Sequence, residues 1–74
     1  MAKQAEHEVR SGLGAMMPGL WRYGMVLVRR LDLADDLAQS TALRALEKAY
    51  QFRPGSRLDA WLITIETSIW RVPA

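Results

Sequence analysis

The chain has 74 residues, of which half are hydrophobic, ten are Lys or Arg, eight are Asp or Glu and none is Cys. This length allows one domain that buries only about 60% of the surface that its unfolded chain exposes. Because the chain has no Cys, disulfides and thiolate metal sites are excluded. The net charge of +2 is only a mild basic excess. Because no apolar run approaches the roughly 20 residues of a membrane span and the N-terminus has no signal-peptide core, we expect a soluble, cytoplasmic protein without a membrane partner.

The N-terminal residues 1–12 show little apolar periodicity. Gly12 and Gly14 weaken any helix that precedes the first strong apolar stripe. We therefore expect a flexible or weakly helical N-terminus over residues 1–12, with a short extra helix as the alternative. The helical domain is then expected at residues 13–74.

The first helix is predicted near residues 17–31, because apolar or small residues recur there at steps of three and four. Pro18 suits the first turn of a helix, where its missing N–H is not needed. The residues that form this stripe are Met17, Leu20, Gly24, Leu27 and Leu31. The basic side chains Arg22, Arg29 and Arg30 lie within this predicted helix.

The second helix is predicted near residues 33–51. Asp32 is suited to the N-cap, and Asp35 places a further carboxylate where it complements the helix dipole. Small residues dominate the face expected to be buried, which allows close approach to a neighbouring helix. This face is predicted to contain Ala34, Leu37, Ala38, Thr41, Ala45, Ala49 and Phe52.

The third helix is predicted near residues 57–71, after a turn at Pro54 and Gly55. Ser56 and Asp59 have the spacing of a capping pair. Its apolar stripe would be Leu58, Leu62, Ile65, Ile69 and Val72, with Trp61 beside it in the core and Trp70 at the rim or on a partner. The predicted fold is all-α, a small three-helix bundle with a core of Leu20, Leu27, Leu37, Ala45, Leu62 and Ile65.

Three short motifs follow one another along the chain. They are L-W-R-Y at residues 20–23, D-L-x-Q-x-T-x-x-R-A-L at residues 36–46, and F-x-P-G-x-x-x-x-A-W-L at residues 52–62. None is specific alone, but their order and separation resemble region 2 of ECF-type (extracytoplasmic function) RNA polymerase sigma factors. The resemblance covers roughly residues 13–71 and implies a sigma region 2-like helical domain in a bacterial transcription protein.

The outer face of the second helix is the first candidate interface. On the pattern alone it is an ordinary solvated face, because a single exposed Leu needs no explanation. The resemblance implies instead that this face binds RNA polymerase core, at the clamp coiled-coil of the largest subunit. The residues so assigned are Asp36, Gln39, Ser40, Leu43 and Arg44. Ser40 departs from the family, which usually has an acidic residue there, and Ala42 replaces a bulky apolar residue.

The basic loop at residues 53–57 is the second candidate interface, with a capped turn and solvated arginines as the alternative. The resemblance implies that this loop and the following helix hold the non-template single strand of promoter DNA at the minus-ten element. The residues so assigned are Arg53, Ser56, Arg57, Thr67, Ser68 and Arg71.

The third helix departs from the family after Ile65, where a basic residue and an Asn are usual and this chain has Glu66, Thr67 and Ser68. We expect Glu66 to repel phosphate. Two functions therefore remain open. The first is a sigma region 2 domain that binds the polymerase clamp and the minus-ten element in transcription initiation. The second is a sigma-like mimic that binds an anti-sigma factor or polymerase but no longer binds promoter DNA. A generic helical interaction domain is a third alternative.

A catalytic function has no support in the sequence. His7 is the only histidine, and the glycine-rich phosphate motifs and the H-E-x-x-H metal motif are missing. Asp35 and Asp36 diverge by about 100° on a helix, and their place in the first turn explains them. We assign no enzyme activity, catalytic residue, metal or cofactor.

Overall fold

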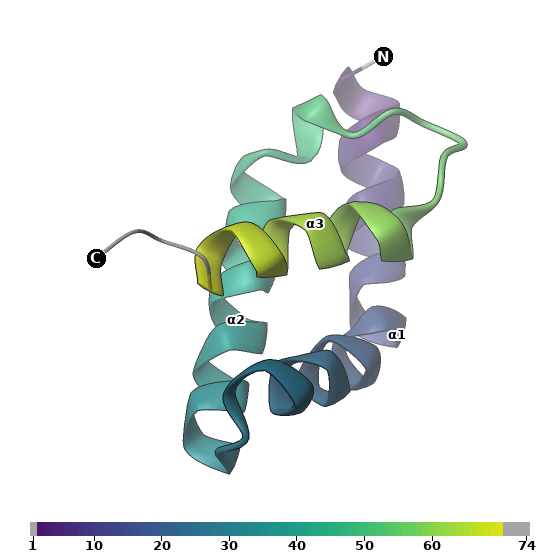
Figure 1. The fold of residues 1–74 in the computed structure, drawn as a ribbon. Coiled ribbons are helices and arrows are strands. Elements are labelled where there is room, and N and C mark those ends of the chain that lie inside the picture. The colour runs from purple at the N-terminus through teal and green to yellow at the C-terminus, as the bar shows by residue number, and fades with distance from the viewer. Residues whose placement is uncertain (1, 71–74) are drawn as a thin grey trace.

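The computed structural model describes residues 2–70, which form three α-helices and one short 3₁₀ turn. Their bounds are Ala2–Val28 for α1, Leu31–Glu47 for α2, Ala49–Gln51 for η1 and Leu58–Trp70 for α3. Figure 1 shows α3 crossing in front of α1 and α2. No strand occurs within residues 2–70, so the predicted all-α three-helix fold is confirmed. None of the helices within residues 2–70 combines the length and the apolar character that a membrane-spanning helix needs.

Helix α1 contains the segment over residues 2–12 that the sequence predicts to be flexible or weakly helical, so the predicted helix start at residue 17 is wrong. The physical reason is a second apolar stripe. Ala5, Val9 and Leu13 recur at steps of four and all three are buried in the core. The polar residues between them face solvent and mask this sparse pattern in the sequence.

Gly12 is a packing residue and does not end a helix. A Cβ atom at this position would lie 2.5 Å from Cδ2 of Leu58. Glycine therefore lets the start of α3 pack directly against α1. The loss of helix propensity at one glycine is about 1 kcal/mol, which the surrounding apolar contacts can offset.

Pro18 lies inside α1 and not in its first turn. An interior proline lacks the N–H that would bond to the preceding turn, and its ring crowds that turn, so helices bend there. Figure 1 shows α1 running alongside α2 and then turning to cross the lower end of the bundle. The bend brings the second part of α1 beneath α3.

A two-residue link joins α1 to α2 and reverses the chain. Arg29 takes a left-handed backbone conformation with φ of 57°, and its N–H donates to the Met25 carbonyl at 2.9 Å. Helix α2 begins at Leu31, with Arg30 at the N-cap and no side-chain cap. Asp32, the predicted N-cap, lies in the first turn and pairs with Arg30 at 3.1 Å. The predicted cap is therefore wrong, because the tight link places the helix start before Asp32.

The buried face of α2 agrees with the sequence. All seven predicted residues are buried: Ala34, Leu37, Ala38, Thr41, Ala45, Ala49 and Phe52. The Thr41 hydroxyl donates to the Leu37 carbonyl at 2.7 Å, which satisfies its polar group inside the core. Helix α2 itself ends at Glu47, and the last predicted turn is the 3₁₀ turn η1.

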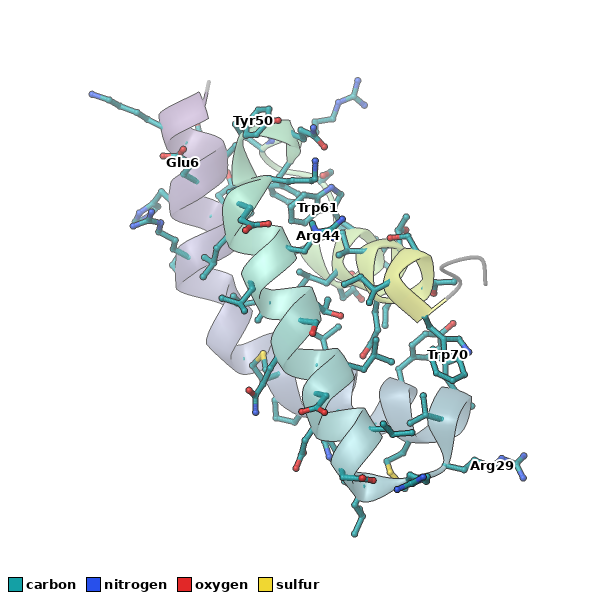
Figure 2. The ribbon with its side chains drawn as sticks, turned by 90° about the vertical axis from the view of Figure 1, so that its left-hand side faces the viewer. Glu6, Arg29, Arg44, Tyr50, Trp61 and Trp70 are labelled. Atoms are coloured by element: carbon teal, nitrogen blue, oxygen red, sulfur yellow. The ribbon has the colours of Figure 1, made fainter. Side chains whose placement is uncertain are left out.

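The core forms where the three helices meet. Five of its six predicted members are buried, namely Leu20, Leu37, Ala45, Leu62 and Ile65, whereas Leu27 is only half-buried. The rings of Phe52 and Trp61 pack with centroids 5.2 Å apart and tilted by 59°. Figure 2 shows Trp61 between α2 and α3 and Trp70 at the far end of α3. Val72 lies outside the described residues.

Candidate functional surfaces

The outer face of α2 is polar with one apolar residue at its centre. Every residue assigned to it from the sequence is exposed: Asp36, Gln39, Ser40, Leu43 and Arg44. This follows from the small-residue stripe, which buries the opposite side of the helix. Leu43 is 65% exposed. Arg44 lies 3.9 Å from Glu47 in a solvated ion pair, which contributes little to stability.

Two further apolar side chains extend this face toward the end of α2. Leu46 and Tyr50 are exposed and follow Leu43 at steps of three and four. Figure 2 shows Tyr50 near the upper end of the bundle, beyond Arg44. Leu46 also lines an open groove of about 520 Å³ between α1 and α2. Leu46 and Tyr50 were not among the residues predicted for this face, although their spacing from Leu43 was the sequence signal for them.

The loop between η1 and α3 is built on a β-turn at residues 53–56. The Ser56 N–H donates to the Arg53 carbonyl at 3.0 Å, and Gly55 has φ of +83°. With Pro54 before it, this is the pattern of a type II turn, in which glycine supplies the positive φ. The Ser56 hydroxyl also donates to the Arg53 carbonyl, at 2.6 Å. The Pro-Gly turn is therefore placed where the sequence predicts it.

Arg57 and Asp59 form a two-bond ion pair at the start of α3. The distances are 3.2 Å from Nε to Oδ1 and 2.8 Å from Nη2 to Oδ2. These hydrogen bonds raise the pKa of Arg57, and together with the Ala60 N–H they lower the pKa of Asp59. The predicted capping pair of Ser56 with Asp59 is not formed, because Asp59 bonds to Arg57 and Ala60. Arg53 is exposed and has no ion-pair partner within residues 2–70.

The loop is also bonded to the N-terminal part of α1. The Gly55 N–H donates to Oε1 of Glu8 at 2.9 Å, across 47 residues of sequence. The other carboxylate oxygen of Glu8 accepts a 3.3 Å bond from the Gln4 side chain. Glu8 was not predicted to contact the loop, because it lies in the segment expected to be flexible or weakly helical.

Thr67 and Ser68, which were also assigned to DNA, do not join the loop in one cluster. Thr67 is half-buried, and its hydroxyl lies 3.4 Å from the Tyr23 hydroxyl of α1. Ser68 is exposed and donates to the Ile65 carbonyl at 2.8 Å. At 1.5 Å per residue, these positions lie about 15 Å along α3 from its start. Arg71 lies outside the described residues.

Glu66 does not face solvent, so the expectation that it repels phosphate is wrong. Its side chain is 0% exposed, and neither carboxylate oxygen has a hydrogen-bond partner. A Cβ atom at Gly24 would lie 3.3 Å from Oε2 of Glu66, so α1 packs directly on the carboxyl group. Burial raises the pKa of Glu66 to about 7. Its spacing of four from Leu62 was the sequence signal for this burial.

The comparisons with known proteins agree with the motifs and the fold. The chain matches the family described as Sigma-70 region 2 over residues 14–69. This range covers most of the chain, which therefore belongs to that family. The chain is also similar to a protein of Rhodopseudomonas palustris (strain TIE-1) named ECF RNA polymerase sigma factor EcfG, with 43% identity over 63 residues. The ECF-type region 2 recognised from the three motifs is confirmed.

The aligned part is 85% of this chain but 35% of the Rhodopseudomonas protein, so the chain spans about a third of that relative. No solved structure matches the chain significantly. Among the described residues, no group of His, Asp and Glu side chains could hold a metal ion.

Proposed function

We propose that this domain acts in transcription initiation as a sigma factor region 2, which binds RNA polymerase core through α2 and engages the promoter minus-ten element. Family membership supports a sigma factor role. The observation that carries the proposal is the outer face of α2, where all five residues assigned to polymerase are exposed on one side of a helix. The residues on the opposite side of that helix are buried in the core.

The chemistry of this face suits docking on a helical coiled-coil such as the polymerase clamp. Interfaces commonly have a central apolar contact within a polar rim that excludes water. Leu43 supplies such a centre, and Asp36, Gln39 and Arg44 supply charged and amide groups around it. Leu46 and Tyr50 add apolar area at one end.

The DNA contact is proposed at the loop over residues 53–57. Single-stranded DNA is held by cationic groups and by stacking on aromatic rings. Arg53 is exposed and can bind a phosphate, whereas Arg57 already forms an ion pair with Asp59. We therefore propose weak binding of the non-template strand, with an affinity that falls as salt rises.

The polymerase contact is tested with one substitution and a closely matched control. Leu43→Ala should weaken binding to purified core polymerase at least about fivefold, because a central apolar contact is worth about 1 kcal/mol or more. Leu31→Ala removes the same side chain from the same helix, at 63% against 65% exposure, but away from the assigned face. Binding would be measured by fluorescence anisotropy of the labelled domain. Equal affinities of the two variants would contradict the proposed face.

The sigma-like mimic remains the second candidate, because the structure leaves few cationic groups for DNA. Arg57 is paired with Asp59, and Thr67 packs against Tyr23. A fluorescence titration with a minus-ten single strand at two ionic strengths separates the two functions. Salt-dependent binding supports the promoter-binding domain. Binding of polymerase or an anti-sigma factor without any binding of the strand supports the mimic.

A further inference from the structure

The bond between Glu8 and Gly55 is the one hydrogen bond recorded between α1 and the basic loop within residues 2–70. The Ser56 N–H and hydroxyl bond to the Arg53 carbonyl inside the turn. Arg57 bonds onward to the first turn of α3, through its side chain to Asp59 and through its carbonyl to the Trp61 N–H. The Ser56 bonds shape the turn, and the Arg57 bonds join only its last residue to α3, so neither set connects the turn to α1. The Glu8 carboxylate joins the turn to a helix that is anchored in the core by Ala5 and Val9.

We infer that Glu8 is a positioning residue, which fixes the loop over residues 53–57 in the orientation that presents Arg53 to a single strand. This inference rests on the proposed DNA contact and adds a role for the first turns of α1, which lie outside the region matched to the family. Gln4 supports it, because its side chain bonds to the second oxygen of Glu8 and holds the carboxylate in place. Charge-assisted bonds of this kind are stronger than neutral ones.

Glu8 has two opposite effects on a bound polyanion. Its hydrogen bond to Gly55 orders the loop before binding, which lowers the entropic cost of association. Its negative charge, close to the same loop, repels phosphate. A substitution that removes only the charge should therefore strengthen DNA binding, and one that removes the bond should weaken it.

Three substitutions separate these effects. Glu8→Gln keeps an oxygen that can accept the Gly55 bond but has no charge. Glu8→Asp keeps the charge but is one methylene shorter and cannot reach Gly55 from the same backbone position. Glu8→Ala removes both. Glu6→Gln is the control for charge alone. Figure 2 shows Glu6 on α1, where it is exposed, and two residues along an α-helix place it about 200° around the axis from Glu8.

The first measurement is hydrogen exchange of the Gly55 amide by NMR. We expect protection in the parent and in Glu8→Gln, and exchange about two- to tenfold faster in Glu8→Asp and Glu8→Ala, as the loss of one hydrogen bond implies. The second measurement is the titration with a minus-ten single strand. Affinity should rise about twofold in Glu8→Gln and fall about two- to tenfold below that value in Glu8→Ala, with Glu8→Asp lowest.

The outcomes distinguish this inference from the proposed function. Equal exchange at Gly55 and equal DNA affinity in the Gln and Ala variants would overturn the positioning role, since charge alone would then explain Glu8. A parent domain that binds no strand would contradict the proposed DNA contact, and the positioning of Arg53 for a strand would fall with it. In that case the Gly55 exchange rates still test the loop contact by itself: faster exchange in Glu8→Ala than in Glu8→Gln supports ordering of the loop by Glu8, and equal rates contradict it. Thermal unfolding of each variant excludes loss of the fold as the cause.

Discussion

The protonation of Glu66 is set by the residues that pack around its side chain. Glu66 occupies a core position of α3 and has neither a cation nor a hydrogen-bond donor as partner. A charged carboxylate is costly in such a place, so the neutral form is favoured and its pKa rises to about 7. The residue opposite is Gly24, which leaves space for the carboxyl group between α1 and α3.

The first prediction concerns the pH dependence caused by Glu66. Its pKa is raised from 4.5 in the unfolded chain to about 7 in the folded domain. The folded state therefore holds the proton more tightly, and this contribution to stability is complete below about pH 4.5 and is lost as the pH rises through about 7. The free energy of unfolding should fall by roughly 1–3 kcal/mol across this range.

Urea unfolding at several pH values between 5 and 8 measures this effect. Glu66→Gln has no titrating group and should flatten the profile, so that the variant is more stable than the parent near pH 8. Glu6→Gln, which changes an exposed carboxylate on α1, should keep the slope of the parent. A parent profile without any fall between pH 5 and 8 would show that Glu66 is not buried in its neutral form.

At the scale of elements, the length of α1 is important because the helix contacts both the basic loop at residues 53–57 and helix α3. Its first turns bury Ala5 and Val9 in the core cluster that also contains Ala49 and Phe52. They also place Glu8 within hydrogen-bond distance of the basic loop. Its second part, beyond Pro18, contacts α3 through Tyr23 and Gly24. One bent helix thus supports both ends of α3.

The second prediction tests whether the first turns of α1 belong to the folded unit. Val9 is 0% exposed, and Val9→Ala should lower the free energy of unfolding by about 1–3 kcal/mol, through lost burial and a residual cavity. Val26→Ala is the matched control, since it makes the same change in the same helix at a site that is 69% exposed. It should change stability by less than about 0.5 kcal/mol. Equal effects in thermal unfolding would place residues 2–12 outside the cooperative unit.

At the scale of the whole molecule, stability depends on one small core, so the loss of a single buried side chain should have a large effect. A domain of this length has only a marginal excess of favourable over unfavourable free energy. Leu62 is buried completely in the cluster that joins the three helices. The outer face of α2, which we propose as the polymerase contact, carries none of this burial, so binding and stability should be separable by mutation.

The third prediction follows from this separation. Leu62→Ala should lower the free energy of unfolding by about 2–5 kcal/mol, which is a large share of what so small a domain has. Leu46→Ala, on the outer side of α2, should have a much smaller effect. Chemical unfolding followed by Trp fluorescence measures both. A Leu62→Ala domain as stable as the parent would contradict the core described here.

Local spacing was enough to predict the three-helix architecture, the buried stripe of α2 and the Pro-Gly turn. Ala34, Leu37, Ala38, Thr41 and Ala45 recur with the period of one helix, so the face that they share is a property of the chain itself. The same reasoning placed Leu43 and its polar neighbours on the opposite, exposed face. Proline and glycine at positions 54 and 55 restrict the backbone directly, and no tertiary contact is needed to predict a turn there.

Three features were decided only by the tertiary structure, because each depends on a partner far along the chain. Val9 makes residues 2–12 helical by packing into a core built from α2 and α3. Glu66 is buried because α1 packs on it at Gly24, although its charge alone suggested a solvated place. Glu8 reaches Gly55 only after α1 and the loop have been brought together by folding. Spacing along a sequence shows which residues share a face, whereas the neighbour of that face is set by how the whole chain packs.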